Sequence, residues 1–73
     1  MKLCDFLKEM CGGGLIYLYQ QDLKNGRAIY KGQFNDAETA LTYLPTKFLN
    51  ASVVSYNTLV YSRATDILIL EAD

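Results

Sequence analysis

The sequence predicts an α+β protein: a single small domain spanning residues 1–73, with the order α-β-β-α-β-β, an antiparallel sheet and helices packed mainly on one face. Two segments have the apolar spacing of helices, and four alternate or are rich in β-branched and aromatic residues. The connections between them are short, which favours antiparallel neighbours. Of the 73 residues, 51% are hydrophobic and 21% charged, the composition of a globular chain.

The first helix is expected over residues 2–11. Its apolar side chains have the i, i+3, i+4, i+7 spacing of one helical face. They are Leu3, Phe6, Leu7 and Met10. Gly12–Gly14 follow as a joint and not as a phosphate cradle. Phosphate-binding glycines precede a helix N-terminus, whereas these follow a helix and precede a strand.

A β-hairpin is expected next, with strands over residues 15–21 and 26–34. Asn25-Gly26 predicts the turn, because both residues tolerate positive φ. In the first strand, Ile16 and Leu18 are expected to face the helices, with Tyr17 and Tyr19 on the far face. In the second strand, a polar face is expected to point outward and its alternate residues inward. The outward set is Arg27, Ile29, Lys31 and Gln33, and the inward set is Ala28, Tyr30, Gly32 and Phe34.

The second helix is expected over residues 35–44, with Asn35 as N-cap and Glu38 completing a capping box. Pro45 ends it, because a residue before proline avoids helical geometry. Residues 45–50 fit a further short turn.

Two strands complete the prediction, over residues 51–62 and 66–72, separated by the polar segment 63–66. Asn57 marks a bulge or a turn in the first of them. The second contains Ile-Leu-Ile-Leu at 67–70, so both of its faces are apolar. Such a strand is either covered on both sides or meets another chain with one of them.

Three segments resemble a group of short proteins from phages and mobile elements of Gram-positive bacteria. These segments are residues 1–10, with a KLxDFL-like helix, residues 29–36, with a YxG-like step, and residues 45–56, with a PxxLLxxxVVSI-like pattern. The matching positions are Lys2, Leu3, Asp5, Phe6, Leu7, Tyr30, Gly32, Pro45, Leu49, Val53, Val54 and Ser55. The resemblance covers about half of the chain. It implies the same architecture and a mobile-element origin, and it transfers no functional residue, because no activity is established for that group.

The residue types predict no catalytic, metal or cofactor site, and hence no enzyme. The chain has no histidine, the commonest general base. Cys4 and Cys11 would lie about 10 Å apart along a helix, too far for a disulfide, and two lone cysteines do not complete a zinc site. Two free thiols fit a reducing compartment.

Charge and hydropathy limit the classes of partner and the cellular location that the sequence predicts. The net charge is −1 and the basic residues are scattered, which disfavours duplex nucleic acid and anionic membranes as partners. Charged residues interrupt the N-terminal segment, so it does not read as a signal peptide, and no apolar run is long enough to span a membrane. A soluble, cytoplasmic protein is expected.

The six tyrosines suggest a binding surface. Tyr17, Tyr19, Ile29 and one apolar face of the last strand, Ile67 and Ile69, would form a patch that binds a protein partner or a second copy. The predicted function is a small non-catalytic protein-interaction module, homodimeric and of phage or mobile-element origin.

Three alternatives stay open at this point. The tyrosines can serve only as cross-strand pairs of a pleated surface. They can stack on the bases of single-stranded nucleic acid. The chain can also inhibit a host defence enzyme by mimicking nucleic acid, although a charge of −1 is small for mimicry.

Overall fold

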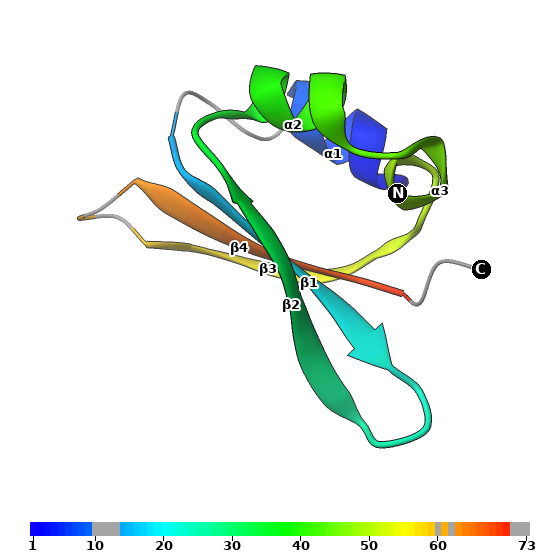
Figure 1. Ribbon diagram of the computed structural model, residues 1–73. Helices are drawn as coiled ribbons and strands as arrows, with labels where there is room; N and C mark the ends of the chain where they lie inside the picture. The colour runs from blue at the N-terminus through cyan, green and yellow to red at the C-terminus, as the bar shows by residue number, and fades with distance from the viewer. Residues whose placement is uncertain (10–13, 60, 62, 71–73) are drawn as a thin grey trace.

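Three helices cover one face of a four-stranded sheet in the computed structural model (Figure 1), which describes residues 1–9, 14–59, 61 and 63–70. The α+β class and the predicted element order are confirmed. The elements are α1 (Leu3–Glu9), β1 (Ile16–Asp22), β2 (Arg27–Phe34), α2 (Ala37–Tyr43), α3 (Thr46–Leu49), β3 (Val53–Leu59) and β4 (Ala64–Ile69). The predicted roles of Met10, Cys11, Gly12 and Gly13, and the predicted strand end at 71–72, lie outside the described residues.

The sheet is mixed, and the expectation of a wholly antiparallel sheet was wrong. Its strand order is β2-β1-β4-β3. β1 and β2 form one antiparallel hairpin and β3 and β4 another, while β1 and β4 pair in parallel at the centre. Residues 35–50 carry the chain from one edge of the sheet to the other. β3 therefore starts at the far edge in the direction of β2, and β4 returns in the direction of β1.

The core lies between this sheet and the helices. It combines side chains from α1, α2 and the two central strands. Its buried members are Leu3, Phe6, Leu7, Ile16, Leu18, Ala37, Ala40, Ile67 and Ile69. The spacing of the first helix thus predicted the inward face of α1 correctly for the residues described.

The start of the chain is fixed beside β3. The Leu3 N–H donates to the Ala51 carbonyl and the Val53 N–H donates to the Met1 carbonyl, each with an N···O distance of 2.8 Å. Lys2 and Ser52 form an antiparallel bridge between these two bonds. Residues 1–3 thus cover the beginning of the outward edge of β3.

Hydrogen bonding corrects the predicted N-cap of α2 and adds detail to the predicted β1–β2 hairpin, which is confirmed. The N-cap of α2 is Asp36 and not Asn35, since the Thr39 N–H donates to Asp36 Oδ1 at 2.7 Å. The hairpin loop spans the four residues 23–26, and Gly26 takes a positive φ of 67° there while Asn25 does not. Asn25 instead donates its side-chain amide to Asp22 Oδ2 at 2.7 Å.

The structure also gives the end of α2, the place of the irregularity in β3 and the start of β4. Leu44 is extended, with ψ of 138°, so α2 ends before Pro45 as predicted, and α3 follows. Asn57 lies in regular pairing; the irregularity of β3 falls between Val53 and Ser55. The segment 63–66 is not a polar break, because β4 already begins at Ala64.

Close approach of two backbone segments explains why a glycine, Gly14, precedes β1. A Cβ at this position would run into the Arg63 carbonyl oxygen, at the turn that leads into β4. One residue later the Thr65 N–H donates to the Leu15 carbonyl at 2.8 Å, which begins the parallel contact of the two central strands. For Gly14, the joint interpretation is therefore supported by close backbone approach.

Replacing Gly14 with alanine should destabilise the fold. The added methyl group would push the Arg63 backbone away from β1, and overpacking of this kind costs about 1–3 kcal/mol. Gly26→Asn is the matched control, because nothing lies within 4 Å of a Cβ there and asparagine tolerates positive φ. Urea unfolding followed by circular dichroism measures both. Equal stabilities for Gly14→Ala and Gly26→Asn would contradict the close approach.

Candidate functional site

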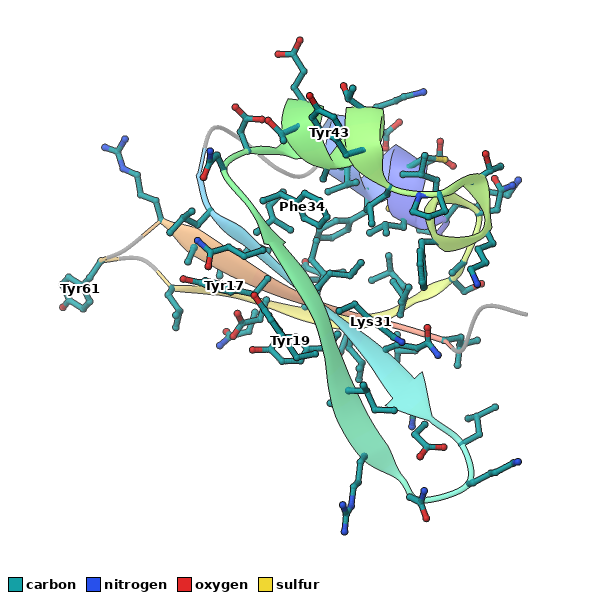
Figure 2. The ribbon with its side chains drawn as sticks, viewed as in Figure 1. Tyr17, Tyr19, Lys31, Phe34, Tyr43 and Tyr61 are labelled. Carbon is teal, nitrogen blue, oxygen red and sulfur yellow. The ribbon has the colours of Figure 1, made fainter. Side chains whose placement is uncertain are left out.

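The face of the sheet that points away from the helices is uncovered in Figure 1; we call it the outer face. Residues directly opposite each other in neighbouring strands share a face, so the strand pairing assigns its members. They include Tyr17, Tyr19, Gln21, Ala28, Tyr30, Gln33, Ser55, Asn57, Leu59, Asp66 and Leu68. Figure 2 shows Tyr17 and Tyr19 on this side, whereas Phe34 lies between the sheet and the helices.

An aromatic pair lies at the middle of the β1–β2 hairpin. Tyr19 and Tyr30 are opposite each other, with ring centroids 5.6 Å apart and planes tilted by 60°. Aromatic pairs in tilted geometry contribute about 0.5–1.5 kcal/mol beyond the area that they bury. Tyr30 is still 54% exposed, because it lies on an edge strand. The pair therefore presents a fixed aromatic surface to solvent.

The predicted faces of β2 are wrong before Gly32. The β1–β2 register shifts between Leu18 and Tyr19, which leaves Lys31 as an extra residue. A shift of one residue moves every following side chain to the opposite face. Tyr30 therefore lies on the outer face, and Ile29, opposite Gln20, faces the helix side.

Ile29 is consequently not part of an outer patch. It remains 41% exposed because the end of the β1–β2 hairpin projects beyond the helix layer (Figure 1). The glycine at position 32 within an alternating run was the available signal for a bulge.

Ile67 and Ile69 are not surface residues either. Ile67 lies opposite Leu18, and Ile69 lies opposite Gln20, on the helix side of the parallel pair. Both have no exposed area and belong to the core. Leu68, opposite Tyr19, lies on the outer face at the position where Ile67 and Ile69 were predicted.

A shallow hollow of about 260 Å³ lies on the outer face. Its lining comes from all four strands: Tyr19, Ala28, Ser55, Tyr56, Asn57, Asp66, Ile67 and Leu68. Tyr19 is the one sequence-predicted patch residue that lines it from the outer face. Small side chains at 28 and 55 border larger ones at 19 and 68, which makes the surface concave and suited to a protruding apolar group.

The charges around this hollow do not favour a polyanion. Asp66 is half-buried in its lining, and no lysine or arginine is among the described lining residues. Arg27, at the far end of β2, lies opposite Asp22 and not beside Tyr19. Bases stacked on Tyr19 and Tyr30 would therefore bring their phosphates toward a carboxylate, without the positive groove typical of single-strand binding.

The carboxylates with shifted pKa values serve the fold. The Asn25 amide and the Lys24 N–H donate to the Asp22 carboxylate in the hairpin loop and lower its pKa. The hydroxyl and N–H of Thr39 lower the pKa of Asp36 at the start of α2. Within residues 1–9, 14–59, 61 and 63–70, no three potential ligands cluster to hold a metal ion, and Cys4 is a free thiol.

Each helix in the described part of the chain is too short to cross a membrane, since the longest have seven residues. Comparison of the chain with protein-family models, with curated proteins and with solved structures returned no match. A function for this chain is therefore inferred from its own geometry, and the mobile-element origin stays a hypothesis.

The lowered pKa values of Asp22 and Asp36 predict an acid-side loss of stability. A carboxyl with a folded pKa below its ordinary 3.8 stabilises the fold above that value, and the contribution disappears as the pH falls through the folded pKa. The free energy of unfolding should thus decline below about pH 4. Asp36→Asn retains a capping side chain that does not titrate, so its decline should be shallower.

Urea unfolding between about pH 2.5 and pH 7 measures these slopes. Glu38→Gln on the same helix is the control, because no cap hydrogen bond depends on the Glu38 carboxylate. Identical acid-side slopes for the parent chain and Asp36→Asn would contradict the assigned role of the Asp36 carboxylate.

Proposed function

We propose that this chain is a small, non-catalytic, homodimeric protein-interaction module that binds a protein partner through its outer face. The observation that carries the proposal is the exposed Tyr19–Tyr30 pair beside a hollow on a sheet face that none of the described helices covers. Tyrosine at such a position supplies large contact area with few rotatable bonds. A partner would place an apolar side chain against Leu68 and stack against Tyr30.

Size supports the same proposal. A domain of 73 residues buries only about 60% of the surface that its unfolded chain exposes, and its core is correspondingly marginal. Covering the outer face on binding would remove further apolar surface from water. We also propose a cytoplasmic location, which the free thiol of Cys4 fits. The sequence resemblance motivates the proposal of a mobile-element origin.

Affinity capture from cells that carry the gene tests the outer face. Tyr19→Thr with Tyr30→Thr removes both rings and keeps residues that suit a strand, so the sheet should fold. We expect partner recovery to fall at least about tenfold, the loss expected when one interface anchor worth more than about 1.4 kcal/mol is removed.

Tyr43→Thr is the matched control, since Tyr43 is 75% exposed on α2, away from the outer face (Figure 2). It should retain the full set of captured proteins. The same proteins recovered with the parent chain, the double variant and Tyr43→Thr would contradict binding through the outer face, provided that circular dichroism shows the double variant folded.

Single-stranded nucleic acid is the competing ligand for a tyrosine-bearing sheet. Because Asp66 borders the hollow, we expect no change in fluorescence anisotropy when labelled oligonucleotides are added at low salt. If the parent chain binds the oligonucleotide and the Tyr19→Thr, Tyr30→Thr variant does not, the ligand of the outer face is nucleic acid and not a protein.

A further inference from the structure

The two edges of the sheet differ in how they are protected. Among the described strands, β2 and β3 each pair with one neighbour, so each has a row of backbone groups that no described strand pairs with. β2 carries Arg27 and Lys31 and is interrupted by the bulge at Lys31, both of which discourage strand addition. β3 has neither a lysine nor an arginine, and residues 48–62 contain no charged side chain at all.

The free part of the β3 edge begins where the N-terminal segment ends. Residues 1–3 pair with residues 51–53, and no strand among the described residues pairs with the outward edge of residues 54–59. Three large apolar side chains are left half-exposed along this stretch: Val54 at 46%, Tyr56 at 54% and Leu59 at 45%. An uncharged, apolar edge of this length is a template for strand pairing.

We propose that this edge pairs antiparallel with β3 of a second copy, giving one continuous sheet across a two-fold dimer. The inference rests on the proposed self-association and identifies its interface, the free edge of β3 at residues 54–59, which we call the seam. A second copy is the favoured occupant because the edge is uncharged and pairs with itself without repulsion. Self-pairing of β2 would bring Arg27 and Lys31 of the two copies together.

The register follows from the regular part of the strand. Pairing with β4 is regular from Ser55 to Leu59, and Asn57 lies at its centre. A two-fold axis at Asn57 places the two Asn57 side chains opposite each other, Tyr56 opposite Thr58, and Ser55 opposite Leu59. Opposite residues then share a face, so both helix layers lie on one side and the two outer faces become one surface.

The surroundings of the edge fit this register. A hollow of about 360 Å³, lined by Met1, Phe6 and residues 53–56, lies at the Val54 end of the edge. Leu59 of the second copy would lie opposite Ser55, on the outer-face side of this end of the edge, and would lose part of its contact with water. The dimer would end in two β2 edges, whose charges and bulge oppose further addition, so the assembly closes at two copies.

Lysine at the centre of the seam tests the inference. Asn57→Lys would place two positive charges across the axis, whereas Gln33→Lys places the same charge on the other edge strand, also exposed on the outer face. Sedimentation should give twice the chain mass of 8.2 kDa for the parent and for Gln33→Lys, and 8.2 kDa for Asn57→Lys. Ser55→Lys is a second seam variant should Asn57→Lys fail to fold.

A cross-link tests the geometry directly. In a chain with Cys4→Ser and Cys11→Ser, Asn57→Cys should form a disulfide-linked dimer under mild oxidation, because residues facing each other across antiparallel strands lie about 4.5–5.5 Å apart. Gln33→Cys should not. A monomer at millimolar concentration, a dimer unaffected by Asn57→Lys and Ser55→Lys, or equal cross-linking at both positions would overturn the inference.

The failure of this inference can be told from that of the proposed function. Tyr19→Thr with Tyr30→Thr leaves β3 unchanged and should still sediment as a dimer. Unchanged partner capture by this variant, with the dimer intact, would contradict only the outer face as the docking surface. A monomer that still captures its partner through the outer face would contradict the dimer and its β3 interface, and would leave the outer face as the docking surface.

Discussion

The parallel pairing of β1 with β4 joins two hairpins that would otherwise be separate, and the other features of the molecule follow from it. Because both strands have neighbours on each side, their backbone groups are paired within the sheet and their inward side chains can be fully buried. Leu18 opposite Ile67 forms the middle of that buried layer. The same pairing leaves β2 and β3 with one neighbour each. Since α1, α2 and α3 all lie on one face, the described part of the chain leaves the opposite face uncovered.

Local pattern was enough to predict the elements and the direction of some side chains, and it failed where direction depends on a distant strand. Tyr17 points outward because apolar residues flank it in an alternating run, a property of β1 alone. Ile67 and Ile69 have equally apolar neighbours. The local sequence therefore does not indicate which face of the strand points inward. Only pairing with a strand almost fifty residues earlier decides that they face the helices. Ile29 and Tyr30 face the sides opposite to those predicted for a different reason, which is the extra residue at Lys31.

The outer face and the β3 edge are parts of one surface. Asn57 belongs to the outer face by the direction of its side chain and to the edge by its strand, and it lines the hollow with Tyr19 and Leu68. Dimerisation at the edge would therefore change the outer face without covering it, by placing two hollows side by side. A partner with a repeated or symmetric apolar feature would gain most from that arrangement.

The central claim is that β1 and β4 pair in parallel, and nuclear Overhauser effects between backbone protons test it most directly. The fold predicts a series of contacts that advances in the same direction along both strands, from Ile16 with Thr65 through Leu18 with Ile67 to Gln20 with Ile69. Contacts that advance in opposite directions, or contacts of β1 with β3 in place of β4, would contradict the account, because Ile67 and Ile69 would then lose their assigned place in the core.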